Sequence, residues 1–419
     1  MGKTAAEKIL ARAAGRDAVE AGEIAWVKPD LATLPDASVL HSLDQLEALG
    51  LEVPHDSSKT AFLVDHLVQV NDDVDVKIVN RARAMARTPG FCGHFFDAGC
   101  GLAHQVPVEK GLIRPGMAVV SIDTHVTTLG ALGAIAIPVN ADVIYVLAKG
   151  AIWMKVPETV NIRISGTRGL GVEARDLILY IISRLGWETA NYRVIQFEGP
   201  VIEDMSIDQR MTLCNGVVQI GAKAGFVAAD RKTVDYLRDR VDEEIVPVAS
   251  DSNAKYARVI DLDISTLEPQ IALPPTPDNV RPVGDCHGTR VDWAFIAGCA
   301  SSRIHDLRVA ASILKNRKVH DRVRLVISPS SQEILLRALE EGLLETFIKA
   351  GAMIMPPTCG PCYGKGIRLA DGEVCLGTGT RNEPGRMGSK NAQVYIGNPA
   401  TVAASSVAGE IVDPREFLS

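Results

Sequence analysis

A proline-rich stretch is the feature that most limits how this chain can fold. Five prolines fall within residues 267–282. Proline fixes φ and lacks a backbone N–H, so we predict that this stretch forms neither a helix nor a central strand. It is the best predicted linker between domains. The chain has 419 residues, too many for one ordinary hydrophobic core, which also favours two or three domains.

Strand and helix patterns alternate on both sides of this stretch, which predicts an α/β protein. Before it, we predict strands at 61–65 and 117–123, and helices at 5–14, 74–87, 175–185, 211–224 and 231–242. After it, we predict a strand at 293–298, a helix with an apolar stripe from Leu307 to Leu314, a strand at 323–328, and a helix capped by Ser330 that reaches toward Gly342. This order predicts a right-handed parallel unit with a site at the carboxyl ends of its strands.

Charge and composition exclude several classes of function. The chain carries 44 Lys and Arg against 51 Asp and Glu, a formal net charge of -7, so no global field attracts nucleic acid or an anionic membrane. No secretion signal opens the sequence, and apolar runs such as 131–139 are shorter than the roughly 20 residues that span a bilayer. We therefore expect a soluble, cytoplasmic protein that binds neither nucleic acid nor membrane.

Three of the eight cysteines lie on loops at one edge of the predicted C-terminal sheet. Cys299 follows the strand at 293–298, and Cys359 and Cys362 follow a Met-Ile-Met run that is predicted to be a strand. Three thiolates at one edge can hold three irons of a cubane cluster and leave a fourth iron open. The residues alone leave three alternatives: a zinc site completed by a histidine, a thioredoxin-type thiol pair, or buried cysteines without a cofactor.

Arginines near these cysteines favour an acidic ligand. Arg303 lies four residues after Cys299, and Arg381 and Arg386 lie in a turn-rich segment at 380–388. A guanidinium group binds a carboxylate through two parallel hydrogen bonds. Together, three arginines and three cysteines indicate a site for a polycarboxylate.

Over essentially its whole length, the sequence resembles the aconitase superfamily and, within it, the large subunits of 3-isopropylmalate dehydratase. The motifs that carry the resemblance are Asp65-His66, Ala103-His104-Gln105, Asp123-Thr124-His125, the segment 210–215 and Gly221-Ala222-Lys223. The resemblance implies a three-domain α/β fold with parallel and mixed sheets flanked by helices around a central cluster site. The implied domains are 1–158, with the Asp-His pairs; 159–275, a central α/β domain; and 276–419, the cluster-binding domain.

The same resemblance implies a role for each motif. Cys299, Cys359 and Cys362 match the ligands of a 4Fe-4S cluster. The implied catalytic residues are Asp65, His66, His104, Asp123, His125 and Gln219, and the implied substrate-binding residues are Ser301, Arg303, Arg381 and Arg386. The implied activity is that of a hydro-lyase, which dehydrates and rehydrates a 2-hydroxy di- or tricarboxylate such as 3-isopropylmalate or a substituted malate. The implied partner is a small subunit that carries a swivelling domain with a serine base.

Some positions depart from the family pattern. Ala300-Ser301 follows the first cysteine where the family has Thr-Asn, Thr380 replaces an asparagine before Arg381, and Gln219 replaces a glutamate. Pro35-Asp36 stands where a His-Asp pair is usual. Because the cysteines and arginines are kept while the polar groups around the substrate change, we expect an atypical substrate. The alternative is a cluster-bearing sensor or another non-catalytic homologue.

Overall fold

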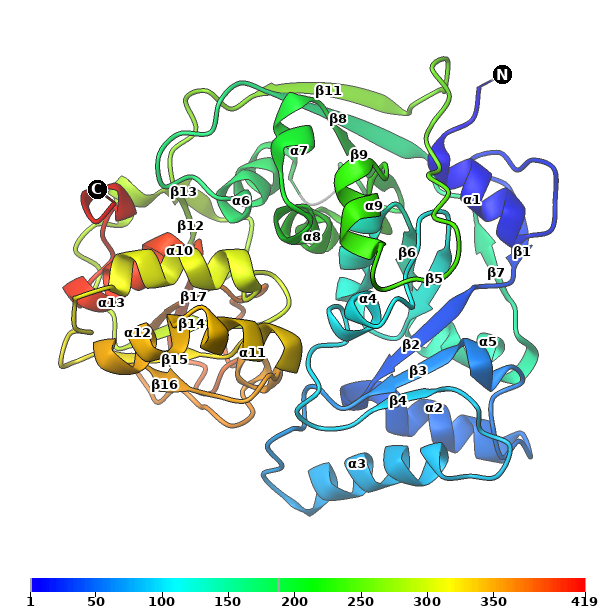
Figure 1. Ribbon diagram of the computed structural model, residues 1–419, viewed down its shortest axis with the longest axis horizontal. Helices are drawn as coiled ribbons and strands as arrows, with labels where there is room; N and C mark the ends of the chain where they lie inside the picture. Colours follow the sequence, from blue (N-terminus) through cyan, green and yellow to red (C-terminus); the bar gives the residue numbers. More distant parts are fainter. Residues whose placement is uncertain (1, 187–188, 419) are drawn as a thin grey trace.

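The computed structural model describes residues 2–186 and 189–418. The strands in this part of the chain form four sheets (Figure 1). The first sheet has five parallel strands in the order β4-β3-β2-β5-β6. Their bounds are β2 Leu31–Pro35, β3 Thr60–Leu63, β4 His94–Phe96, β5 Ala118–Ser121 and β6 Ile135–Pro138. Every residue of β2, β3, β5 and β6 is buried, as expected for parallel strands that are covered on both faces.

Helices in the first third confirm two sequence predictions. The helix α1 (Ala5–Ala13) has Thr4 as its N-cap residue, and Thr4 forms a capping box with Glu7. The helix α3 (Asp73–Ala86) begins at Asp72, whose side chain accepts the first backbone N–H groups. The other helices here are α2 (Asp36–Ala48), α4 (Val106–Glu109) and α5 (Val143–Lys149), and a separate antiparallel ribbon pairs β1 (Ile24–Val27) with β7 (Ile152–Lys155).

A second parallel sheet forms the middle of the chain, in the order β10-β9-β8-β11. Its strands are β8 (Thr159–Ser165), β9 (Val194–Glu198), β10 (Ala224–Val227) and β11 (Arg258–Asp263), and its helices are α6 (Ala174–Leu185), α7 (Pro200–Asp204), α8 (Ile207–Gly216) and α9 (Arg231–Leu237). The 3₁₀ helix η2 (Thr124–Leu132), which follows β5, packs against α8 and β10. This packing requires glycine at 130, because a Cβ there would lie 1.9 Å from the carbonyl oxygen of Gly225. The first two units are therefore in close contact.

The third sheet has seven strands in the order β13-β12-β18-β17-β14-β15-β16. Five of its strands are parallel to their neighbours within this group: β14 (Trp293–Ile296), β15 (Arg324–Ile327), β16 (Met353–Ile354) at the edge, β17 (Val374–Gly377) and β18 (Gln393–Ile396). Its helices are α10 (Ile304–Leu314), α11 (Gln332–Glu340), α12 (Leu343–Ala350) and α13 (Pro399–Ala408). The predicted strand-helix-strand-helix order after residue 290 is confirmed.

The proline-rich stretch is part of this third sheet. It contains β12 (Gln270–Ala272) and β13 (Val280–Pro282), which pair antiparallel, and Ala272 also pairs with Ile396 of β18. Our prediction that the stretch forms no central strand is therefore wrong, because β12 has a neighbour on each side. The strand is possible because Pro269 and Pro274 lie outside its three residues, so that no ladder hydrogen bond is lost.

Three predicted helices differ from the structure at one or both ends. The helix α8 begins four residues before our prediction, because Ser206 caps it by accepting the N–H of Gln209, and it ends at Gly216 rather than 224. The following residues form the short 3₁₀ helix η4 (Val217–Ile220) and then β10. The helix α9 ends at Leu237 rather than 242, and α11 is capped by Ser331 rather than Ser330.

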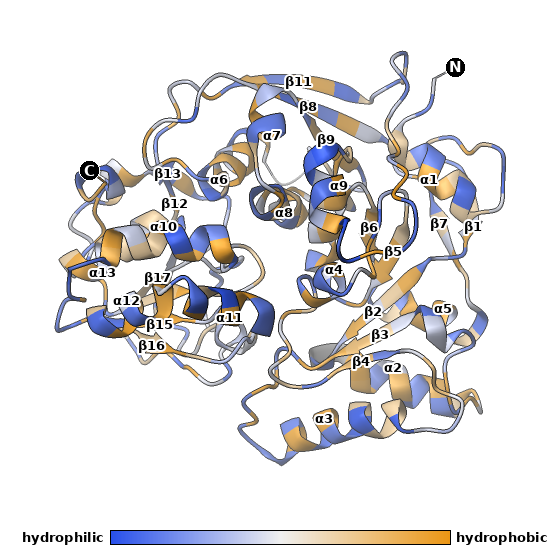
Figure 2. Ribbon diagram, in the orientation of Figure 1, coloured by the Kyte–Doolittle hydropathy of each residue, from blue (hydrophilic) through white to orange (hydrophobic). Residues whose placement is uncertain are grey.

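The hydrophobic core joins the first two sheets and leaves the third largely separate. One buried cluster combines residues of 31–136 with residues of 160–267, and another lies wholly within 271–412. Figure 2 shows β5 and β6 as apolar, while much of α9 and α11 is polar. We keep the division at 158 and 275 as a proposal. In the residues that the structure describes, no helix combines the length and hydropathy that crossing a membrane requires.

Candidate active site

The carboxyl ends of two parallel sheets meet at the candidate site. Asp36, Asp65 and Asp123 follow β2, β3 and β5 of the first sheet within two residues of each strand end. Cys299 and Cys359 follow β14 and β16 of the third sheet. The backbone N–H of Cys359 donates to the carbonyl oxygen of Asp65 over 2.7 Å. Ligands of α/β proteins bind at this edge of a parallel sheet, so the topology supports a site here.

His66 lies in a buried acidic pair on the first sheet. Its Nδ1 is 2.7 Å from Oδ1 of Asp65 and 3.4 Å from Oδ1 of Asp36. Burial alone would lower the pKa of His66, but the two carboxylates raise it well above its usual value. The arrangement therefore favours a protonated imidazole. We did not name Asp36 as a site residue, although Pro35-Asp36 stands where the resemblance places a His-Asp pair.

A second group joins Asp123 to two histidines. Nε2 of His104 is 3.0 Å from Oδ1 of Asp123, which also accepts the backbone N–H of His125 over 2.7 Å. Burial would raise the pKa of Asp123, but its contacts with both histidines hold it well below its usual value. Burial would lower the pKa of His104, but Asp123 raises it. Nδ1 of His104 and Nε2 of His125 are buried and have no partner in the described part of the chain, so they are available to a ligand.

The three predicted cysteine ligands are brought together. Cys299 and Cys362 are buried, and Cys359 is half-buried and interacts with both. Interaction with the Cys359 thiol lowers the pKa of Cys299 to about 5 and that of Cys362 well below its usual value. Nδ2 of Asn215, on α8, donates to Sγ of Cys299 over 3.2 Å. The same contacts raise the pKa of Cys359 well above its usual value, so the group favours thiolates, the form that binds metals, at Cys299 and Cys362.

The three sulfurs do not form a ready-made tetrahedral zinc site, although Cys359 interacts with both of the others. Four ligands of one tetrahedral zinc lie about 4 Å apart. Among the described residues, the only set of three or more His, Cys, Asp or Glu whose ligand atoms lie within 4.8 Å of one another is Asp36, Asp65 and His66. The three cysteines are not in that set, so they are spread more widely than zinc requires. Cys359 and Cys362 are joined by the short 3₁₀ helix η6 (Gly360–Tyr363) with no α-helix after it, which also departs from a thioredoxin-type pair.

The predicted substrate arginines differ in what they contact. Arg303 is almost completely buried, and each of its three nitrogens donates to the chain: Nε to Gln105, Nη1 to the carbonyl of Ala300 and Nη2 to the carbonyl of Cys299. By contrast, Nε of Arg381 and Nε of Arg386 are buried without a partner among the described residues. Arg386 also interacts with Cys362. The two arginines after β17 are thus the ones with donors free for a carboxylate.

Two further predicted residues have unsatisfied polar atoms. Oγ of Ser301 and Nε2 of Gln219 are buried and lack a partner in the described residues. Ser301 lies two residues after Cys299. Gln219 lies in η4, which packs against η2, the 3₁₀ helix that contains His125. Thr380 places Oγ1 4.0 Å from Sγ of Cys362. Unsatisfied buried donors on several sides of the cysteines support a polar ligand between them.

Sequence reasoning missed Arg175, in the first turn of α6. Its side chain is buried, and Nη2 donates to the carbonyl oxygen of Gly379, next to Thr380. Burial lowers the pKa of Arg175 to about 10, while the Cys299 and Cys362 thiolates oppose that shift. No local pattern distinguishes it from any arginine at the start of an amphipathic helix, so only the tertiary structure reveals it.

A buried glutamate links the two halves of the site. Glu109 accepts hydrogen bonds from Oγ of Ser331 over 2.6 Å and from Nε2 of Gln105 over 2.7 Å, and Gln105 in turn holds Arg303. Burial raises the pKa of Glu109 from 4.5 to about 7. The charged Glu333 adds to this shift, and Arg240 opposes it.

We expect the Glu109→Gln variant to be more stable than the parent above pH 7. Between pH 4.5 and about 7 the folded Glu109 keeps a proton that the unfolded chain has lost, so its contribution to stability falls as pH rises through this window and stays low above it. Across this pH window the free energy of unfolding of the parent falls by about 3 kcal/mol, since each unit of pKa difference corresponds to about 1.36 kcal/mol. Denaturant unfolding across this pH range measures the difference. Glu340→Gln, at an exposed position of α11, is the control, and equal pH slopes for parent and Glu109→Gln would contradict the prediction.

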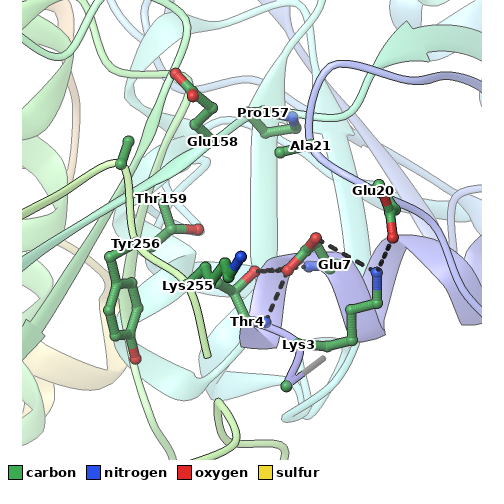
Figure 3. Close-up of a pocket in the computed structure, with 12 residues that line it drawn as sticks. Lys3, Thr4, Glu7, Glu20, Ala21, Pro157, Glu158, Thr159, Lys255 and Tyr256 are labelled. Atoms are coloured by element: carbon green, nitrogen blue, oxygen red, sulfur yellow. Dashed lines mark hydrogen bonds and ion pairs between the residues drawn. The ribbon is translucent and has the colours of Figure 1, made fainter. Parts of the chain in front are cut away.

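A separate cavity of about 250 Å³ lies beside the start of α1 (Figure 3). Lys3 lies at its edge, 3.2 Å from Glu20 and 3.8 Å from Glu7. Lys255 and Tyr256 line it from the segment before β11. It contains none of the predicted site residues, so it does not contribute to the candidate active site.

Comparisons with known proteins agree with this geometry. A model of the "Aconitase family (aconitate hydratase)" matches residues 7–290 and 285–409. The chain is 44% identical over 421 residues to "3-isopropylmalate dehydratase large subunit 1" of Methanopyrus kandleri, with 100% of each chain covered. It is 40% identical to a 3-isopropylmalate dehydratase large subunit of Sulfurihydrogenibium sp., covering 99% of this chain and 97% of the relative. It is also 41% identical to a "Probable methanogen homoaconitase large subunit" of Methanothermobacter thermautotrophicus, covering 98% and 97%.

Proposed function

Since this chain belongs to the aconitase family and is a hydro-lyase, we propose that it is a large subunit that dehydrates and rehydrates a 2-hydroxy di- or tricarboxylate. The observation that supports this most strongly is the convergence of three thiols with unpartnered histidine and arginine atoms in one buried site. The relatives carry the names of enzymes for 3-isopropylmalate and homoaconitase reactions. A 3-isopropylmalate-like or substituted malate substrate is therefore the proposal, and a sensor role is not favoured.

We propose Cys299, Cys359 and Cys362 as the ligands of a 4Fe-4S cluster. When bound, such a cluster supplies a Lewis acid at the iron that no cysteine holds. Nδ2 of Asn215 supports the site by donating to Sγ of Cys299, and this contact fixes the orientation of that sulfur. Arg303 supports it from the other side, because it holds the carbonyls of Cys299 and Ala300.

The substrate's carboxylates bind the arginines that follow β17. Arg381 and Arg386 have buried Nε donors without partners, and a guanidinium holds a planar carboxylate through two hydrogen bonds. Ser301 and Gln219 offer further donors to the substrate's polar groups. In this proposal, Arg303 positions the Cys299 loop rather than touching the substrate, because all three of its nitrogens already donate within the chain.

His104 assists departure of the hydroxyl group as a general acid. Asp123 fixes Nε2 of His104 and raises the pKa of the ring, which favours its protonated form. Nδ1 is then a donor with no partner in the described chain, and it is available to the leaving hydroxyl. His125 offers its unpartnered Nε2 from the adjacent helix η2, and the Asp65–His66 pair holds a further buried proton beside the Cys359 loop.

Removal of the proton from the neighbouring carbon needs a base. We propose that a separate small subunit supplies it, from a serine on a swivelling domain, because the resemblance implies such a partner and the relatives are named large subunits. The partner would cover the site at the meeting edges of the first and third sheets.

The direct test is anaerobic reconstitution of the chain with iron and sulfide, with and without the small subunit. Each preparation is screened with 2-hydroxy diacids for the ultraviolet absorption of an enoate product. We expect brown iron-sulfur absorption in both preparations and turnover only with the small subunit. Turnover without any cluster, or a loaded two-subunit enzyme that acts on no 2-hydroxy acid, would reject the proposal.

We expect the Gln219→Glu variant to lose activity on the native substrate at neutral pH. A glutamate at this buried position introduces a negative charge that repels a substrate carboxylate, and the neutral amide does not. The expected loss in kcat/KM is about tenfold or more, which corresponds to about 1.4 kcal/mol. Turnover of 3-isopropylmalate is measured in parallel and is expected to improve. A tenfold gain on the native substrate, or no change on any acid, would count against this role.

A further inference from the structure

Arg175 is a buried cation without a carboxylate partner. Its side chain is 3% exposed, and it forms no ion pair within residues 2–186 and 189–418. Nη2 donates to the carbonyl of Gly379, and Nε is buried with no partner in the same residues. Arg210 offers a contrast: it is 1% exposed, but its guanidinium binds Asp230 and two backbone carbonyls. A buried charge without a counter-charge is strongly destabilising, so Arg175 needs an explanation.

The nearest carboxyl groups do not provide the missing counter-charge. The charges of Asp176 and Asp306 act on Arg175, but burial raises the pKa of each to about 7, so that each is only about half ionised at neutral pH. Asp176 already accepts hydrogen bonds from the N–H of Gln270 and from Nδ2 of Asn398. Asp306 caps α10 by accepting the N–H of Arg303. Each carboxyl group is therefore used elsewhere.

The cysteine site does lie beside Arg175. The residue that it binds, Gly379, is packed against the cysteines, since a Cβ on Gly379 would lie 3.7 Å from Sγ of Cys362. The next residue, Thr380, approaches the same sulfur with its hydroxyl. Arg175 thus reaches from α6 of the central sheet to the loop after β17 of the third.

We infer that Arg175 is the fixed counter-charge of the iron-sulfur cluster, a positioning residue that holds the loop around Cys362 and stabilises the negative charge of the bound thiolates. The inference rests on the proposed cluster and adds a residue to its surroundings. Charge and hydrogen-bond donors near the sulfurs set the reduction potential of such a cluster and its retention. The unpaired arginine therefore destabilises the empty chain and stabilises the loaded one.

The test compares Arg175→Met with the matched control Arg210→Met, in the full chain with and without iron. In the chain stripped of iron, Arg175→Met is expected to unfold at the same temperature as the parent or a higher one, because an uncompensated charge is removed. Arg210→Met is expected to unfold at a lower temperature, because it leaves Asp230 without its partner. In the reconstituted chain, Arg175→Met is expected to release iron to a chelator about tenfold faster than the parent. Metal affinity typically falls by about tenfold or more when a residue that supports the metal ligands is removed.

The reduction potential of the cluster gives a second readout that a purely structural role would not move. Loss of a positive charge disfavours the added electron, so Arg175→Met is expected to shift the potential to a more negative value, while Arg210→Met leaves it unchanged. Arg175→Lys keeps the charge and is expected to restore much of the parent potential.

Two results would overturn the inference. One is a reconstituted Arg175→Met chain with the parent's potential and iron release. The other is an iron-free Arg175→Met chain that is destabilised as much as Arg210→Met, which would make Arg175 an ordinary structural residue. If Arg175→Met fails to fold, Arg175→Lys and the potential decide the question. A parent chain that takes up no cluster at all would instead reject the proposed function.

Discussion

Replacement of Cys299, Cys359 or Cys362 by serine, one at a time, is expected to abolish stable cluster binding and to reduce turnover to background. A serine hydroxyl is a harder ligand than a thiolate and is not ionised at neutral pH. The Cys359 thiol lowers the pKa of Cys299 to about 5, and this contact is lost when Cys359 is replaced. Iron and sulfide content after anaerobic reconstitution, together with visible absorption, measures the effect.

The same chain provides matched controls for the cysteine variants. Cys214 and Cys375 are buried outside the site, and burial raises the pKa of Cys375 to about 12, so these thiols are poor metal ligands. Cys92 is exposed, near Ser57. Serine at 92, 214 or 375 is expected to leave iron content unchanged. Full iron and activity in any one of the three site variants would show that the ligand assignment is wrong.

The Asp123→Asn variant is expected to lower kcat by about 100-fold to 10,000-fold, the range typical of a lost general acid. Asp123 holds both Nε2 of His104 and the backbone of His125, and its charge raises the pKa of His104. An amide removes that charge, so His104 loses its proton at a lower pH. Since the acid must be protonated, activity falls as pH rises through the pKa of His104, and in the variant this fall moves to lower pH. A pH profile of kcat measures both effects.

Asp413→Asn is the control for this variant. Asp413 also precedes a short 3₁₀ helix, η7 (Pro414–Glu416), and its side chain accepts the N–H of Arg415, but it lies outside the candidate site. We expect a parental kcat and pH profile for it. An Asp123→Asn enzyme with the parent's pH profile would contradict the role of His104 as an acid.

The sequence predicted those parts of the fold that local patterns determine. Alternating apolar strands and capped helices predicted β5, α1, α3 and the order of elements around β14 and β15, because each pattern involves residues close together in the chain. The pairing of β12 with β18 was not predictable in this way. It joins residues more than 100 positions apart, and nothing in a proline-rich stretch indicates a distant strand.

In the candidate site, too, local motifs predict some residues, and only the tertiary structure reveals the others. Motifs predicted Asp65, His104 and the cysteines, and the structure brings these residues to one place. Motifs gave no way to distinguish Arg303, whose donors are all used, from Arg381, whose Nε is free, because only burial and contacts separate them. Arg175 was missed for the same reason. Its function depends on Gly379, which lies about 200 residues later in the chain.

The place of the cysteines in the chain has a consequence for biosynthesis. Both Asp-His groups lie before residue 126, whereas the first cysteine of the site is Cys299 and the last strand of its sheet, β18, ends at Ile396. Domains fold largely in the order in which the ribosome makes them. The acid-base half of the site therefore folds well before any of the three thiols has been made, and the sheet that carries the thiols closes only after residue 396 has left the ribosome. A cluster bound by these thiols would therefore be assembled only after translation of that strand, on a chain whose first two sheets are already folded.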